Sequence, residues 1–272
     1  MDIGPRGSRL RVRSLDKRFD RRGSEQEVHA LAGVDFEVDA GEFVAIVGAS
    51  GCGKTTLLRI IAGLELASAG EVLVDGRRVD GPAPDRGLMF QDYALFPWKT
   101  VWANVEFGPR ARRWPRDRQR SVVRRYIDLV GLGGFERKYP FELSGGMRQR
   151  CAFARLLASE PAVLLLDEPL AALDAQTRSI MQEETLRIWG EDLPPRERRT
   201  VVYVTHSIAE AVYLADRVIV MRGRPGTLSA DFPIDLPRPR RVGSSHPSFG
   251  RYEDEIWRLI RDEASQAIQE QS

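Results

Sequence analysis

A glycine-rich segment near residue 50 carries residue types that bind phosphate. Residues 48–55 follow the spacing glycine, four residues, glycine, lysine, threonine. Such glycines let successive backbone N–H groups curl around an anion, and a helix that begins there adds its positive dipole end. Lys54 would reach the β- and γ-phosphates of a nucleotide, and the Thr55 hydroxyl would ligate Mg²⁺. A glycine-rich turn with a solvated lysine is the simpler alternative, but the flanking strand and helix patterns disfavour it.

Two carboxylates follow an apolar run further along the chain. Asp167 and Glu168 come directly after Ala162–Leu166, which has the pattern of a buried strand. Ligands of open α/β sheets bind at the carboxyl ends of strands, so both acids are expected to face the phosphate site. Asp167 would point toward the water shell of a metal, and Glu168 would polarise an attacking water. Taken alone, the pair also fits an acidic turn at a strand end.

A third segment joins a helix start to two glycines. Ser144 suits a helix N-cap, and Gly145 and Gly146 leave the first N–H groups open to an anion. Physical chemistry alone also allows a plain cap that precedes a core helix.

These segments need elements that bring them together. Predominantly apolar runs predict buried parallel strands, and they occupy residues 43–47, 162–166, 201–204 and 217–221. Strands that alternate with helices indicate an α/β parallel sheet. The other expected elements are alternating strands near 10–15 and 34–38, a core helix over 55–64, a hairpin over 71–79, a mostly helical insertion over 93–155 with helical spacing at 118–132, and an amphipathic helix from residue 252.

Composition limits the possible partners. The chain has 272 residues, of which 42% are hydrophobic and 29% charged, and this excludes a disordered or disulfide-scaffolded chain. The net charge of +2 gives no electrostatic case for nucleic acid. No apolar run approaches the roughly 18 residues of a membrane span. With two cysteines and no recognisable secretory signal, the expected compartment is the cytosol.

Six segments, taken in order, resemble the ATPase subunit of an ATP-binding cassette (ABC) transporter. They are the phosphate loop at 48–55, a glutamine loop at 89–92, a signature at 143–149, the strand end at 165–169, Leu173-Asp174 and Val204-Thr205-His206. The resemblance covers about residues 8 to 225. It implies an α/β fold of the P-loop NTPase class: an ABC cassette with a parallel-sheet core, an N-terminal antiparallel β subdomain and an inserted α-helical subdomain. We expect the core over 1–92 and 156–232, the helical subdomain over 93–155 and a C-terminal extension over 233–272.

The resemblance also implies a role for each matching residue. The catalytic residues would be Lys54, Gln91, Glu168 and His206, and the Mg²⁺ ligands would be Thr55, Gln91 and Asp167. Phe19 occupies the position where the family stacks an aromatic ring on adenine, although a core phenylalanine fits almost as well. The other ATP contacts would come from Gly48, Ala49, Ser50, Gly51, Cys52, Gly53, Lys54, Thr55 and Thr56, and from Ser144, Gly145, Gly146 and Asp174.

Stoichiometry and partners follow from the same resemblance. In the family, the residues matching Ser144 to Gly146 bind the γ-phosphate of the opposite subunit, so the functional unit would be a dimer of two chains with two ATP sites. It would lie peripherally at the cytoplasmic face of the inner membrane, bound to a permease and served indirectly by a solute-binding protein. Phe96 and Trp98 lie where the family docks the permease, and core packing explains them equally well.

Two short segments suggest a group within the family. Residues 95–105 and 234–240 look like importers of nitrate, sulfonate or taurine, and the 46 residues after Gly226 are too few for the regulatory domain of sugar importers. Import of another small solute is one alternative, and a soluble ABC ATPase that acts on nucleic acid or ribosomes is a less favoured one. A regulator without turnover would need a damaged Glu168 or His206, and both are present.

Overall fold

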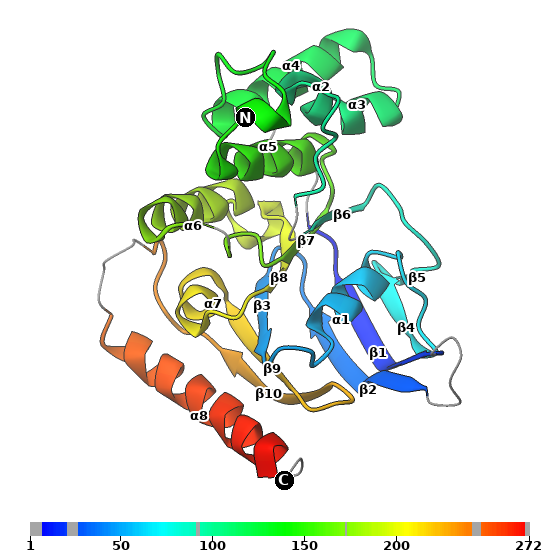
Figure 1. Ribbon diagram of the computed structural model, residues 1–272, viewed down its shortest axis with the longest axis vertical. Coiled ribbons are helices and arrows are strands. Elements are labelled where there is room, and N and C mark those ends of the chain that lie inside the picture. The colour runs from blue at the N-terminus through cyan, green and yellow to red at the C-terminus, as the bar shows by residue number, and fades with distance from the viewer. Residues whose placement is uncertain (1–6, 21–26, 91–92, 172, 241–245, 270–272) are drawn as a thin grey trace.

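The computed structural model describes residues 7–20, 27–90, 93–171, 173–240 and 246–269 (Figure 1). Within these ranges the strands form a four-stranded sheet of order β2-β1-β4-β5 and a six-stranded sheet of order β10-β9-β3-β8-β7-β6. Helices cover both faces of the larger sheet. The α/β class with a parallel core and a separate antiparallel sheet is therefore confirmed.

The larger sheet carries the phosphate loop and the acidic pair at its strand ends. Its parallel strands are β3 (Phe43–Gly48), β6 (Arg86–Met89), β7 (Val163–Asp167), β8 (Thr200–Val204) and β9 (Arg217–Arg222), and β10 (Thr227–Pro233) pairs with β9 antiparallel. Strands β3, β7 and β8 are buried along their whole length. Both faces of these strands are covered, which explains why they are apolar throughout rather than alternating.

The antiparallel sheet contains β1 (Leu10–Phe19), β2 (Val28–Val38), β4 (Ala69–Val74) and β5 (Arg77–Arg78). Helix α1 (Lys54–Ile61) lies between this sheet and the larger one, and its leucines and isoleucines belong to a core shared with both. Because that helix is buried from two sides, it needs apolar residues almost all round.

Four helices gather at one end of the molecule, above the larger sheet in Figure 1. They are α2 (Val101–Val105), α3 (Phe107–Ala111), α4 (Arg116–Leu129) and α5 (Gly145–Ala158), with a 3₁₀ turn at Pro140–Glu142. The expected helical character of this part of the chain is confirmed. The boundaries 93 and 155 remain a prediction, and α5 continues three residues beyond the second of them.

The remaining helices are α6 (Ala175–Trp189), α7 (Ile208–Leu214) and α8 (Pro247–Gln269), with a 3₁₀ turn at Pro195–Glu197. Helix α8 runs along the lower edge in Figure 1 and packs on α7 and β9, with Ile256 fully buried. Among the described helices, none combines the length and the apolar character that crossing a membrane requires.

A buried arginine fixes the segment that leads to α8. The guanidinium of Arg240 donates to five backbone carbonyls, at 2.7 to 3.3 Å, around the end of α7 and the segment after β10: those of Val212, Tyr213, Ala215, Ile234 and Leu236. Burial lowers the pKa of Arg240 to about 10. One side chain thus satisfies carbonyls that would otherwise lie unpaired at a helix end.

We expect Arg240→Met to destabilise the chain, since methionine fills the space but donates to none of these carbonyls. The loss should be about 2–4 kcal/mol, or roughly 5–10 °C in melting temperature. Thermal unfolding measures the change in melting temperature, and Arg258→Met, on the exposed surface of α8, is the control. Equal melting temperatures for the two variants would show that these hydrogen bonds contribute little.

Candidate nucleotide site

The turn between β3 and α1 has the shape of an anion cradle. Gly51 and Gly53 have φ angles of +80° and +95°, a backbone conformation that residues with a Cβ rarely adopt. At Gly53 a Cβ would also lie 2.6 Å from Leu31 Cδ2. Gly53 is the N-cap of α1, and no side chain accepts a hydrogen bond from the first N–H groups of the helix. These N–H groups are therefore free to bind an anion in the loop.

Lys54 lies inside this loop and is only 5% exposed. Its Nζ donates to the carbonyl oxygens of Gly48 and Ala49, both at 2.8 Å, and lies 3.8 Å from Cys52 Sγ. The loop backbone therefore holds the ammonium group at the centre of the cradle. An ammonium in that place attracts the β- and γ-phosphates of a nucleotide.

Thr55 and Asp167 approach each other from two different elements. Thr55 Oγ1 donates to Asp167 Oδ1 at 3.3 Å, which joins the start of α1 to the end of β7. Burial raises the pKa of Asp167; the hydrogen bond from Thr55 opposes this, and the charge of Glu168 adds to it. Two adjacent oxygen ligands suit Mg²⁺, which binds through one or two protein oxygens together with phosphates and water.

Glu168 and His206 form a close pair beside the loop. His206 Nε2 lies 2.6 Å from Glu168 Oε1, and their side chains are 43% and 16% exposed. Glu168 has a φ of +47°, a strained conformation for a residue with a Cβ, and its N–H donates to the carbonyl of Val204 on β8. Strain of this kind concentrates at functional sites, where the surrounding structure enforces it.

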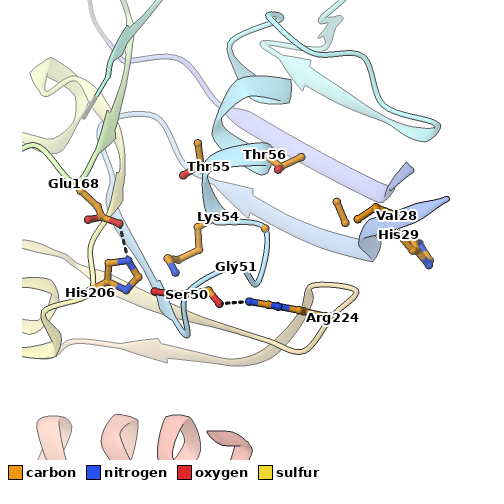
Figure 2. Close-up of a pocket in the computed structure, with 12 residues that line it drawn as sticks. Val28, His29, Ser50, Gly51, Lys54, Thr55, Thr56, Glu168, His206 and Arg224 are labelled. Carbon is orange, nitrogen blue, oxygen red and sulfur yellow. Dashed lines mark hydrogen bonds and ion pairs between the residues drawn. The ribbon is translucent and has the colours of Figure 1, made fainter. Parts of the chain in front are cut away.

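These groups surround one cavity of about 390 Å³ (Figure 2). Glu168 and His206 stand at one end, Lys54 lies between them and the helix start, and Val28 and His29 form the opposite end. Its lining residues are Val28, His29, Ala30, Ser50, Gly51, Gly53, Lys54, Thr55, Thr56, Glu168, His206 and Arg224. The structure thus brings together most of the loop residues with the catalytic pair expected from the sequence.

The signature segment and Asp174 do not line this cavity. Ser144 is the N-cap of α5 and accepts from Met147 N, and Asp174 is the N-cap of α6 and accepts from Thr177 N. The hydrogen bonds from Thr177, first its N–H and then its hydroxyl, lower the pKa of Asp174. A Cβ on Gly146 would lie 3.4 Å from Thr177 Cγ2, so the two helix starts adjoin. Both caps are solvent-exposed, as surfaces that serve a second chain would be.

Two further residues from the sequence analysis stand apart. Phe19 is half-buried on β1, opposite Val28 of β2, and Lys17 Nζ lies 4.5 Å from its ring centroid, but the ring does not line the cavity. Stacking of Phe19 on adenine stays a prediction. Gln91 lies outside the described residues, so its place at the metal does too.

The structure adds residues to the site that the sequence analysis missed. His29 lines the cavity, and its Nε2 is 2.7 Å from Asp16 Oδ1. Arg224, in the turn between β9 and β10, donates to the Ser50 carbonyl at 3.0 Å, a contact visible in Figure 2. The hydrogen bond from Gly33 N–H, followed by that to His29, lowers the pKa of Asp16. The contacts of His29 with Asp16 and of Arg224 with Ser50 join segments that are separated in the sequence. No local residue spacing could therefore predict them.

Several known proteins are similar to this chain over most of its length. A family model described as ABC transporter matches residues 31–171. The nitrate import ATP-binding protein NrtD of Synechocystis sp. is 45% identical over 93% of this chain and 95% of its own length. The taurine import ATP-binding protein TauB of Roseobacter denitrificans is 41% identical over 93% of this chain and 94% of its own length.

A solved structure matches as well. It is a dimeric, post-hydrolysis state of the ATP-binding cassette MJ0796 with bound ADP and Pi, and it is 29% identical, with a TM-score of 0.73 over 84% of this chain and 100% of that one. The phosphate loop, the acidic strand end and the histidine after β8 thus occur here in the fold that the solved cassette shares. The chain belongs to the ABC transporter family and is one of its ATP-binding, ATP-hydrolysing cassettes.

Proposed function

We propose that this chain powers uptake of a small anion of the nitrate, sulfonate or taurine class through a separate permease. The observation that carries the proposal is the single cavity in which the phosphate-binding Lys54 faces the pair Glu168 and His206. The nitrate and taurine import proteins, similar over nearly their whole length, support the direction of transport and the substrate class. Import of a different small solute remains the alternative.

From this geometry we infer a part in hydrolysis for each residue. Lys54 and the loop amides hold the β- and γ-phosphates and neutralise the charge that develops on them. A water between Glu168 and the γ-phosphate attacks the phosphorus, the bond to the bridging oxygen breaks, and Glu168 accepts the proton of the water. His206 lines the same cavity with its side chain 43% exposed, and its Nε2, 2.6 Å from Glu168 Oε1, orients that carboxylate; the imidazole would also contact the γ-phosphate of a bound nucleotide.

The residues present fit a bound Mg²⁺. Thr55 and Asp167 would hold the ion, directly or through water, and we expect Gln91 to complete the set of ligands. When bound, Mg²⁺ neutralises charge on the β- and γ-phosphates. Asp167 is the less exposed of the two adjacent acids, so the metal and the attacking water are served by separate carboxylates.

Two copies of the chain would form the working unit. The exposed N-termini of α5 and α6, with Ser144, Gly145, Gly146 and Asp174, would face the nucleotide of the partner copy. The dimeric state of the similar solved cassette supports this assembly. Each ATP would then lie between the phosphate loop of one copy and the signature of the other.

The permease would dock in a groove beside β6 and α5. This groove, of about 760 Å³, is lined by apolar residues that include Leu88, Phe96, Phe107 and Leu156, with Arg86, Arg112 and Arg155 at its walls. Trp98, 71% exposed, lies next to Phe96 with ring centroids 5.8 Å apart. An amphipathic helix from a membrane protein fits such a groove. Docking there would place the chain peripherally at the cytoplasmic face of the inner membrane.

Recovery of partners from membranes tests this proposal. The tagged chain should retain a permease and its solute-binding protein, and mass spectrometry of the small molecule held by that protein identifies the transported class. Phe107→Glu should reduce permease recovery about tenfold or more, while ATP hydrolysis by the free chain is retained. Phe135→Glu is the matched control, because Phe135 has similar exposure, 40% against 46%, and lies outside the groove. Recovery of ribosomes or DNA without a permease would contradict transport.

A further inference from the structure

A buried carboxylate lies behind the catalytic pair and takes no part in the steps above. Glu210 is on α7, four residues after His206, and is only 5% exposed. Its Oε2 accepts from Thr205 Oγ1 at 2.5 Å, and its Oε1 is 3.4 Å from Gln182 Nε2 on α6. Burying a carboxylate costs free energy unless hydrogen bonds compensate, so its retention here calls for a reason.

The hydrogen bonds around Glu210 enclose His206 from both sides. Thr205 gives its single hydroxyl proton to Glu210, which leaves the hydroxyl oxygen to accept the N–H of Ser207 at 3.1 Å. Ser207 Oγ in turn accepts the N–H of Glu210 at 3.2 Å. The residues immediately before and after His206 are therefore both tied to Glu210, and the backbone at His206 has little freedom to rotate.

The residues around Glu210 make a glutamate hard to replace at position 210. One carboxylate oxygen faces the turn that carries His206, and the other faces α6, the helix that Asp174 caps. Tyr203, fully buried on β8, lies beside it: burial raises the pKa of Tyr203, and the negative charge of Glu210 adds to the effect. An apolar residue here would leave Thr205 without its acceptor in a dry site.

We propose that Glu210 is a positioning residue for ATP hydrolysis, which holds the turn at Thr205–Ser207 so that the His206 imidazole stays against Glu168. Glu210 acts through His206, and it is not among the residues that line the cavity. The inference rests on the role proposed above for His206. It also assigns a purpose to Ser207, which supplies the N-cap that closes the ring of hydrogen bonds.

Steady-state hydrolysis by the full chain tests the proposal. Glu210→Leu and Thr205→Val should each lower kcat about tenfold, the effect of losing one charge-assisted hydrogen bond, while ATP affinity changes less than about twofold. Thr205→Ser, which keeps the hydroxyl, should restore kcat. Glu183→Leu, an exposed glutamate on α6, is the control for loss of charge. Should Glu210→Leu fail to fold, the Thr205 variants still decide.

A double-mutant cycle separates this role from a general effect on folding. In a His206→Ala background, Thr205→Val should cause no further loss of kcat, because the residue it positions is gone. Equal and additive losses in both backgrounds, or wild-type kcat in Thr205→Val, would overturn the proposal. Full activity of His206→Ala itself would instead refute the role proposed for His206, so the two failures are distinguishable.

Discussion

Replacing Glu168 with glutamine is expected to lower ATP hydrolysis by roughly 10²- to 10⁴-fold, the contribution of a positioned general base. The glutamine keeps the size of the side chain and can still contact His206, but its amide cannot accept the proton of the attacking water. Lys54 and the loop amides are untouched, so ATP binding should persist. The variant should therefore accumulate as an ATP-bound dimer, which the wild-type chain is expected to form only transiently.

Two measurements check this expectation. Phosphate release gives kcat, and size-exclusion chromatography with and without ATP and Mg²⁺ gives the assembly state. Glu183→Gln, an exposed glutamate on α6, should behave as wild type in both. Undiminished turnover in Glu168→Gln would remove Glu168 from the role of base. Loss of both turnover and the ATP-dependent dimer would mean that the substitution acts on binding instead.

The end of the cavity that holds Glu168 and His206 could be predicted, because both residues follow adjacent parallel strands. Strands β7 and β8 pair in register, with Asp167 opposite Val204, so Glu168 and His206 leave the sheet side by side. The phosphate loop follows β3, the next strand in the sheet, and points to the same edge. The apolar run of each strand can be recognised in the local sequence. The parallel topology then places the residues that follow these strands at one edge of the sheet.

The opposite end of the cavity could not be predicted in this way. Val28 and His29 come from the antiparallel sheet, and Arg224 comes from the turn after β9. Their approach depends on how the two sheets pack around α1, which no spacing in the sequence encodes. The same holds for Glu210, whose position four residues after His206 shows its helix but not its burial.

Two strands of the larger sheet also escaped prediction. Strand β6 has four residues, of which one is glycine and one is arginine, and three are only half-buried. Strand β10 lies at the sheet edge and is half-buried or exposed throughout, so its apolar pattern is weak. Both depend on pairing with a neighbouring strand rather than on their own composition. The proposed domain boundaries at residues 92, 155 and 232 remain a prediction. Such boundaries depend on tertiary contacts, which the local sequence does not encode.

Mixing two inactive variants is expected to restore hydrolysis if each ATP site is shared between copies. Lys54→Ala removes the ammonium group from the phosphate loop, and Gly145→Asp places a negative charge at the signature beside the expected γ-phosphate. A Cβ on Gly145 meets only the tip of Arg148, at 4.0 Å, so this variant should fold. Alone, each should lose at least about 100-fold in kcat, the cost of one misplaced electrostatic contact at a transition state.

In a mixed dimer the intact loop of the Gly145→Asp chain meets the intact signature of the Lys54→Ala chain. One of the two sites is then wild type, so an equal mixture should recover about a quarter of wild-type hydrolysis by random pairing. Phosphate release as a function of mixing ratio measures this, with a maximum at equal amounts. A chain that carries both substitutions, mixed with wild type, should restore nothing and should depress activity below simple dilution, because every mixed dimer then has two damaged sites. Activity that stays at the level of the separate variants at all ratios would show that each chain completes its own site, and Ser144 and Asp174 would then need another explanation.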